Sequence, residues 1–173
     1  MSVINTTAAR FYFYKKHNSM FGNLEGDAID TILHHQIIGH IGCHADSTTY
    51  VVPISYAYED GCIYAHAKDG MKINMMRQNP QVCFEVYRME NMGNWQCVIS
   101  WGNFEEITDE KERATALNIL LKRDLPVITS KTVQLTVHWP FLPEDLNEIK
   151  GIVFRIKLTT KTGRYERTEE IRY

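Results

Sequence analysis

The sequence contains no apolar run that approaches the ~20 residues needed for a membrane-spanning helix. Its N-terminus lacks the order of basic and then apolar residues that marks a signal peptide. A net charge of −2 and a pI near 6.4 give no sign of a surface that attracts nucleic acids or membranes. We therefore expect a cytoplasmic protein whose partners include neither a nucleic acid nor a membrane.

The motifs of several enzyme classes and of metal sites are also missing. The chain has no G-x-S-x-G, Walker A or Rossmann glycine pattern, so nothing supports a serine hydrolase or a P-loop enzyme. Its four cysteines lack CxxC spacing, and in a reducing compartment we expect buried thiols. His40 and His44 would be too far apart on a strand to bind one ion, so we expect no metal site.

The composition is that of one globular domain. Of 173 residues, 44% are hydrophobic and 23% are charged, which are ordinary proportions. A chain of this length can bury a core without disulfides or metals. We divide it into an N-terminal arm, residues 1–23, and a single domain, residues 24–173.

Strands dominate the central part of the chain. β-Branched and aromatic residues predict strands at 37–43, 50–58, 62–66, 81–88, 95–107 and 151–160. Gly39 and Gly42 indicate a bend or a close backbone approach in the first of these. Asp60-Gly61 predicts a hairpin turn, and Thr162-Gly163 predicts a turn into a polar tail. Five or six strands joined mostly by hairpins favour a closed or half-closed antiparallel barrel over a doubly wound parallel sheet.

Three helices are expected, one before the first of these strands and two between strands. Apolar spacing predicts the first over residues 26–35. Asp69 is expected to cap a second helix that ends near Gln78, before Asn79-Pro80. The third runs from about 109 to 123 and starts with a box-like Asp109 and Glu112. Its expected buried stripe consists of Ala114, Leu117, Leu120 and Leu121. Residues 124–150 show no clean period, and we expect them to be irregular.

The stretch from Tyr50 to Pro80 holds the residues best suited to binding a ligand. Pro53 cannot donate a ladder hydrogen bond, so its strand is expected at an edge or at a bulge beside something other than a strand. His66, Gly70 and Lys72 stand within seven positions, where a strand runs into a helix. Backbone N–H groups at a helix start and a nearby cation stabilise an anion, so this junction predicts a phosphate site.

The sequence resembles a known family in these segments. The motifs that carry the resemblance are YVVPISYAYEDGCIYAHAKDGMKINMMRQNPQVCFEV, then CVISWGNFEEITDEKERATAL, and a weaker closing TGR. They resemble the flavin-binding split-barrel proteins related to pyridoxamine 5′-phosphate oxidase, and most closely the branch of nitroimidazole-resistance proteins. The resemblance extends from about Leu24 to Gly163. It implies a mainly β, six-stranded antiparallel split barrel of the FMN-binding type.

The resemblance also implies a homodimer with two flavin sites at the subunit interface. The isoalloxazine ring would lie along the backbone of Tyr50, Val51, Val52, Pro53, Ile54 and Ser55. The ribityl and phosphate part would be surrounded by Ala65, His66, Ala67, Met71 and Lys72, with Lys72 paired to the phosphate. Gln96, Cys97 and Ser100 would reach the flavin from the partner subunit. His66 matches a histidine placed beside the substrate, so it is the candidate catalytic residue, which would hold an anionic substrate or supply a proton.

Departures from the oxidase proper narrow the expected activity. Gly70-Met71-Lys72 stands where the oxidase has Ser-Arg-Lys, Cys97 replaces a glutamine, and the C-terminal RYERTEEIRY lacks the arginine–histidine motif for the pyridoxal substrate. Pyridoxamine oxidation is therefore not expected. We expect a flavin-dependent reductase of a small oxidised compound, with nitro-group reduction as one candidate. The cofactor is FMN by family default, with FAD as an alternative. A non-catalytic flavin carrier or redox sensor and a haem-binding protein are the alternative functions.

Overall fold

A computed structural model describes residues 19–123 and 149–168, which form strands and three helices. The strands are β1 (Ser19–Leu24), β2 (Ile38–Ala45), β3 (Thr48–Glu59), β4 (Cys62–Ala67), β5 (Gln81–Asn91), β6 (Asn94–Glu106) and β7 (Ile152–Thr168). The helices are α1 (Gly26–His35), α2 (Met71–Gln78) and α3 (Glu110–Leu121). None of these helices is long and apolar enough to cross a membrane.

Six of the strands close into a barrel. Antiparallel pairing runs in the order β7-β4-β3-β2-β5-β6, and β6 also pairs with β7, which completes the ring. Two of the strand pairings in this ring are short. β2 and β5 pair only through residues 40–42 and 83–85, and β3 meets β4 only from Tyr56 to Glu59. The predicted six-stranded antiparallel split barrel is confirmed.

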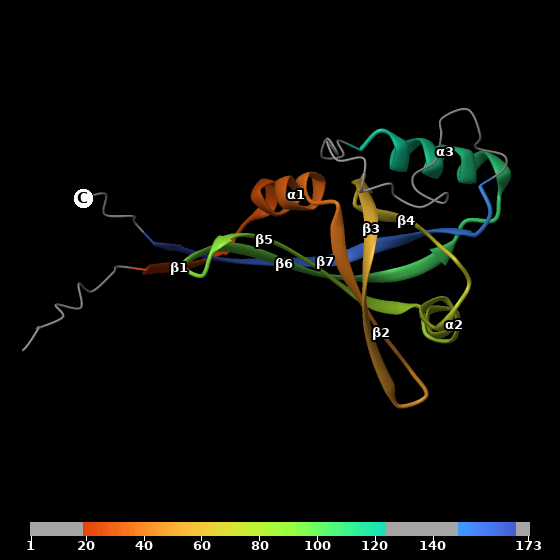
Figure 1. Ribbon diagram of the computed structural model, residues 1–173, viewed down its shortest axis with the longest axis horizontal. Helices are drawn as coiled ribbons and strands as arrows, with labels where there is room; N and C mark the ends of the chain where they lie inside the picture. Colours follow the sequence, from red (N-terminus) through yellow and green to blue (C-terminus); the bar gives the residue numbers. More distant parts are fainter. Residues whose placement is uncertain (1–18, 124–148, 169–173) are drawn as a thin grey trace, which may run out of the picture.

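A seventh strand, β1, joins outside the ring by pairing with the end of β7. We call β1 and residues 87–91, 94–97 and 163–168 the sheet extension; these segments pair with one another and project to one side of the barrel (Figure 1). Residues 19–23 were expected in the N-terminal arm and lie in this strand, whereas residues 1–18 lie outside the described part of the chain.

The turn predicted at Thr162-Gly163 is wrong. β7 continues through both residues to Thr168, well beyond the strand predicted at 151–160. A Cβ atom on Gly163 would lie 2.6 Å from Cβ of Leu24. Gly163 is therefore needed because β1 packs closely on β7 at this point, and not because the chain turns.

The core fills the barrel from the inward faces of the strands. Its largest fully buried side chains include Ile41, Tyr56, Ile63, Phe84, Phe154 and Ile156. Tyr56 and Phe84 meet edge to face with ring centroids 4.8 Å apart. A Cβ atom on Gly39 would lie 2.3 Å from the ring of Phe84, which confirms the close approach expected at this glycine. α1 and α2 pack into this core, whereas α3 packs with Ala57 and Val153 in a second, smaller cluster.

The helix ends follow the predictions in part. α1 matches its predicted range, and the Asp109 carboxylate accepts hydrogen bonds from the backbone N–H groups of Lys111 and Glu112, as expected of an N-cap. The prediction that Asp69 caps α2 is wrong, because Gly70 is the N-cap. Asp69 instead accepts hydrogen bonds from the Gly70 N–H and from Arg77.

The buried face of α3 consists of Ala116, Leu117 and Leu120, so the prediction of Ala114 and Leu121 in it is wrong.

A polar cluster fastens α1 to two strands. The Asp30 carboxylate accepts a hydrogen bond from the Tyr58 hydroxyl at 2.8 Å and forms an ion pair with Lys161. Lys161 also donates to the Tyr58 hydroxyl at 3.1 Å. Burial alone would raise the pKa of Asp30, but the hydrogen bonds from Lys161 and Tyr58 outweigh it and hold the pKa below its ordinary value.

We predict that Asp30→Asn lowers the free energy of unfolding by about 1 kcal/mol at pH 7. Because the pKa of Asp30 is lowered in the folded state, its contribution is present above the unfolded pKa of about 4 and is lost as the pH falls through the folded value. Urea unfolding of both proteins should therefore converge at acid pH. Asp27→Asn, an exposed change on the same helix, is the control. A stability difference that does not depend on pH would contradict the role of the charge.

Candidate functional site

Two thirds of β3 has a free edge. Residues 48–55 pair with β2 on one side, while pairing with β4 begins only at Tyr56. On the other side, no described strand pairs with residues 48–55. The edge position predicted from Pro53 is confirmed. We call residues 48–55 the open edge.

The backbone direction explains why a proline is tolerated there. The Tyr56 N–H donates to the carbonyl of Ile37 at 3.1 Å, on the β2 side. Successive residues of a strand point their N–H and C=O groups to opposite sides. Pro53 therefore faces away from β2, and its missing N–H removes no ladder bond. Thr49, Val51 and Ser55 present main-chain donors and acceptors on that same free side.

The open edge begins where β3 and β4 part. Tyr56 is opposite Ala65, so the same register places Ser55 opposite His66, one step beyond the last pair. Ala65 and Ala67 are buried in the barrel core, as is Ile54 on β3, so these three offer only backbone to a ligand. The side chains of Val51 and Pro53 are exposed, and those of Tyr50 and Val52 are half-buried.

His66 is held at this point by the segment before β7. Its Nε2 lies 2.9 Å from the carbonyl oxygen of Lys150, and since a carbonyl only accepts, Nε2 carries a proton. Gly151 has a φ of +118°, and a Cβ there would be 2.7 Å from Nε2 of His66. Burial lowers the pKa of His66, the bond to Lys150 partly opposes this, and the charges of Arg113 and Lys72 lower it further. His66 therefore lies in the field of two cations.

Lys72 occupies the first turn of α2 and is half-buried. Within the described part of the chain, its ammonium group has neither an ion pair nor a hydrogen bond. Burial lowers its pKa, while the Cys43 thiol nearby acts in the opposite direction. Its neighbour Met71 is exposed. A desolvated cation beside the unsatisfied N–H groups of a helix start can stabilise a phosphate. The fold thus brings together His66 and Lys72, which the sequence predicted as parts of one site.

The three residues predicted to act from the partner subunit do not share a surface. Cys97 lies on the outer face of the sheet, where its thiol donates to Glu85 at 3.5 Å; burial and Glu85 raise the pKa of this thiol to about 11. Ser100 points inward, is 0% exposed, and its hydroxyl has no hydrogen-bond partner among the described residues. Gln96 lines a separate pocket on the sheet extension.

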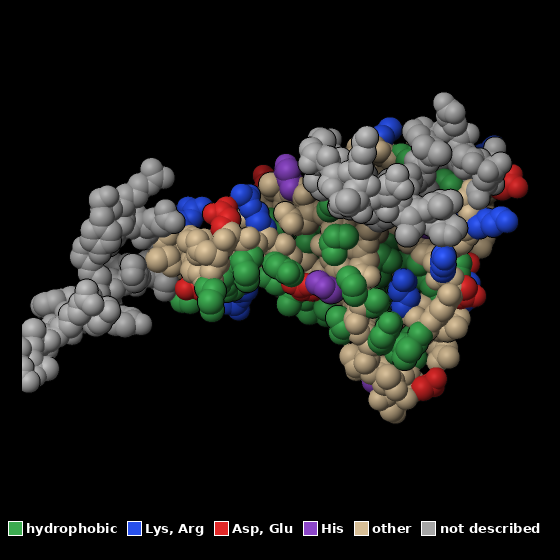
Figure 2. Space-filling model, viewed as in Figure 1, with side chains coloured by type: hydrophobic (Ala, Val, Ile, Leu, Met, Phe, Trp, Pro, Cys, Tyr) green, Lys and Arg blue, Asp and Glu red, His purple; other side chains and the backbone are tan. Residues whose placement is uncertain are grey.

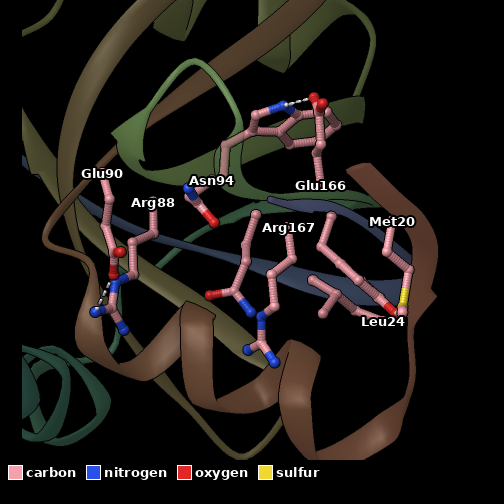
Figure 3. Close-up of a pocket in the computed structure, with 10 residues that line it drawn as sticks. Met20, Leu24, Arg88, Glu90, Asn94, Glu166 and Arg167 are labelled. Carbon is pink, nitrogen blue, oxygen red and sulfur yellow. Dashed lines mark hydrogen bonds and ion pairs between the residues drawn. The ribbon is translucent and has the colours of Figure 1, made fainter. Parts of the chain in front are cut away.

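That pocket, of about 540 Å³, lies between β1, β5, β6 and β7 (Figure 3). Arg88 pairs with Glu90 at 3.0 Å, and the Trp95 indole donates to Glu166 at 2.9 Å. Both carboxylates of the pocket are therefore already engaged by neighbours. None of its lining residues belongs to the open edge, to β4 or to α2.

The outer face of β2, β5 and β6 carries uncovered hydrophobic side chains. Ile38, Tyr87, Met89, Ile99 and Trp101, together with Val51 of the open edge, are between 36% and 63% exposed. His40 and Glu85 form an ion pair at 2.9 Å within this outer face. A groove of about 680 Å³ runs along it beside Val51 and Trp101. Figure 2 shows hydrophobic side chains gathered on the sheet extension and on the β2–β3 hairpin.

The contact of Arg123 with β3 is a feature that the sequence did not reveal. Its guanidinium donates to the Ser55 hydroxyl at 2.7 Å and to the Tyr56 carbonyl at 2.8 Å. A basic residue such as arginine is common at the C-terminal end of a helix, and no sequence pattern connects Arg123 with β3. The described residues contain no group of three or more histidine, cysteine or acidic side chains that could hold a metal ion.

Comparisons with known proteins identify the family and the fold of this chain. A family model described as pyridoxamine 5′-phosphate oxidase matches residues 25–165. An uncharacterized protein of Rhizobium meliloti (strain 1021) is 29% identical over 90 residues, which are 50% of this chain and 60% of the relative. The match thus spans only about 60% of the length of that curated relative.

Two solved structures are similar over most of the chain. A FAD-binding protein from Mesorhizobium loti is 28% identical, with a TM-score of 0.65 over 84% of this chain and 98% of that one. A candidate 5-nitroimidazole antibiotic resistance protein from Bacteroides thetaiotaomicron is 19% identical, with a TM-score of 0.63 over 88% and 92%. The second likeness concerns the fold alone. With the family model covering most of the barrel, this chain belongs to the pyridoxamine 5′-phosphate oxidase family.

Proposed function

We propose that this protein binds a flavin nucleotide along the open edge of β3 and works as an oxidoreductase that reduces a small oxidised compound. The observation that carries the proposal is the free main-chain edge around Pro53, next to an unpaired, half-buried Lys72. The FAD-binding relative at 28% identity supports a flavin as the ligand.

The residues present fit such a cofactor. The pyrimidine end of a flavin ring needs hydrogen-bond donors and acceptors, and the open edge offers both from backbone that is already ordered by pairing with β2. The phosphate needs a cation and N–H groups, which Lys72 and the start of α2 supply. When bound, a flavin supplies the electron-transfer chemistry, and the protein positions it and tunes its surroundings.

His66 is the proposed proton donor or anion-binding residue beside the substrate. It stands opposite Ser55 at the end of the open edge, and its Nε2 proton is engaged by Lys150. Its lowered pKa makes the neutral imidazole the main form at pH 7, so an anionic ligand would be needed to favour the protonated form. Nitro-group reduction, with electrons from NADH or NADPH, is one activity of this class.

A homodimer completes the proposal. The outer face leaves large hydrophobic side chains next to the open edge uncovered by any described segment, and patches of this kind mark protein interfaces. A second copy of the chain would bury this face and would exclude water from a ligand bound at its border. The cytoplasm is the proposed compartment.

Purified protein tests the proposal directly. Flavin absorption bands, rather than a Soret band, are expected in its spectrum, and mass analysis of the cofactor released by heat distinguishes FMN from FAD. Steady-state oxidation of NADH or NADPH with a nitroaromatic acceptor distinguishes a reductase from a carrier or sensor. A colourless protein that does not take up added flavin would falsify the proposal.

Lys72→Gln is predicted to weaken flavin binding about 10- to 100-fold, because a charge-assisted bond to the phosphate is lost. Flavin fluorescence titration of the apoprotein measures the dissociation constant. Lys68→Gln removes an exposed lysine near the same helix and should leave binding unchanged. Equal effects of the two variants would mean that Lys72 contributes only general positive charge.

Ile99→Glu is predicted to convert the dimer to a monomer at micromolar concentration, because it would bury a carboxylate without a partner in the interface. Light scattering after size exclusion measures the mass. Met92→Glu makes the same change at the β5–β6 turn, where Met92 is 89% exposed, and should leave the dimer intact. If the Ile99→Glu protein remains a dimer, the interface lies elsewhere on the molecule.

His66→Ala is predicted to bind flavin normally and to lower the turnover number about 100-fold, as expected when a proton donor is lost. The turnover number of the wild-type protein should fall as the pH rises through the pKa of His66, and the variant should not show this pH dependence. His35→Ala, on the exposed face of α1, is the control. Unchanged turnover in His66→Ala, with a normal flavin content, would remove the proposed role.

A further inference from the structure

Residues 149–151, which precede β7, connect His66 to α3 through their carbonyl groups, and we call them the bridging segment. The carbonyl of Lys150 accepts the hydrogen bond from Nε2 of His66 at 2.9 Å. The carbonyls on either side of it, those of Ile149 and Gly151, accept hydrogen bonds from the Arg113 guanidinium at 2.6 and 3.2 Å. One arginine therefore fixes both neighbours of the carbonyl to which His66 is bonded.

The bridging segment also fits closely against β4. Gly151 has a φ of +118°, a conformation that favours glycine. A Cβ atom there would lie 2.7 Å from Nε2 of His66 and 2.9 Å from the carbonyl oxygen of Ala67. On its other side, Ile149 packs against the apolar cluster that includes Leu117 of α3. Small movements of this segment would therefore move the acceptor of the His66 proton.

The contacts of Arg113 explain why an arginine stands at this position. The side chain is half-buried, and within the described residues its guanidinium pairs with no carboxylate; its neighbour Glu112 pairs with Arg155 instead. Removing a cation from water is unfavourable unless its N–H groups find acceptors. The planar fork of a guanidinium can donate to two carbonyls at once, whereas the single ammonium of a lysine cannot reproduce this geometry.

The hydrogen bond to Lys150 decides which nitrogen of His66 titrates. A neutral imidazole carries one N–H, and a carbonyl can only accept, so the neutral ring keeps its proton on Nε2. A hydrogen bond of ordinary strength favours this tautomer roughly 5-fold. The ring then gains and loses its second proton at Nδ1.

The charged groups around His66 favour its neutral form. Burial lowers the pKa of His66, and the charges of Arg113 on α3 and Lys72 on α2 lower it further, while the bond to the bridging segment opposes them in part. Tyr64 is the preceding residue on the same face of β4, and Arg155, opposite Tyr64 on β7, is paired with acids. The neutral ring is therefore the resting form at pH 7, and its tautomer fixes where a proton can enter.

We propose that Arg113 is a positioning residue, which holds the bridging segment so that neutral His66 keeps its proton on Nε2 and exchanges protons at Nδ1. The part of this inference that concerns catalysis rests on the proposed function. In the proposed reduction, the N–H bond at Nδ1 of the protonated ring breaks, its electron pair stays on the ring, and the proton goes to the substrate. Nε2 remains bonded to Lys150 throughout.

Nuclear magnetic resonance of protein that contains isotope-labelled histidine measures the tautomer without any turnover. His66→Ala identifies the signals of His66 among those of the seven histidines. Above the pKa of His66, the ring with its proton on Nε2 should exceed the other tautomer at least about 5-fold in the wild-type protein. A neutral wild-type ring with its proton on Nδ1 would overturn the proposal.

Substitutions of Arg113 test its role in this preference. Arg113→Lys keeps the charge but cannot donate to both carbonyls in the same way, so the ratio of the two tautomers should fall at least about 2-fold. Arg113→Gln should lower the ratio as well. Lys111→Gln removes an exposed charge two residues away on α3 and should leave it unchanged. A wild-type ratio in both Arg113 variants would limit Arg113 to a structural contact between α3 and the bridging segment.

Gly151→Ala provides a second test that keeps Arg113, even if Arg113→Gln fails to fold. Its Cβ would displace the imidazole from the Lys150 carbonyl, so the same loss of preference is expected, and an unchanged ratio would contradict the close fit. The turnover numbers of Gly151→Ala and Arg113→Lys should fall together with the ratio, at normal flavin content. A wild-type protein with the expected tautomer but no flavin would overturn the proposed function and leave the placement of the proton intact.

Discussion

The site depends on the point at which β3 loses its second neighbour. β4 follows β3 for four residues and then leaves toward α2, so the ladder stops at Tyr56 and Ala65. Continued pairing would satisfy the free backbone groups of the open edge and would leave no place for a planar ligand. Pro53 helps to keep the edge open, because its ring cannot donate to an added strand. The same parting leaves His66 beyond the last pair of the ladder, and α2, which follows β4, packs against β2.

The basic side chains around this opening differ in whether a carboxylate pairs with them. Arg77, Arg155, Lys157 and Lys161 are all engaged by carboxylates, and together they bind Asp69, Glu106, Glu105, Glu112 and Asp30. The acids on the elements that flank the site are thus largely occupied by other bases. Among the described residues, Lys72, Arg113 and Arg123 have no carboxylate partner, and Arg113 and Arg123 donate to backbone carbonyls. A net charge of −2 for the whole chain gives no hint of this local arrangement.

Local signals predicted the fold well. Asp60-Gly61 formed the expected tight turn, with φ of 48° and 73°, and α1 and the cap of α3 followed from spacing and Asp109. Two of the errors share a cause, which is contact with residues far away in the chain. Gly163 was predicted to turn the chain. A glycine is needed there because Leu24 packs closely against it, and Leu24 lies in a strand about 140 positions earlier. Arg123 was missed for the same reason, since only the folded chain brings it to Ser55.

The alternation of side chains along β6 limits what a partner subunit can offer to a flavin. Cys97 projects from the outer face, whereas Gln96 and Ser100 project from the opposite one, so a single ligand cannot meet all three side chains. If a second copy covers the outer face, Cys97 is the one of these three side chains that faces the interface. The raised pKa of the Cys97 thiol keeps this group protonated and neutral at pH 7. The phosphate would then depend on Lys72 of the chain that binds it.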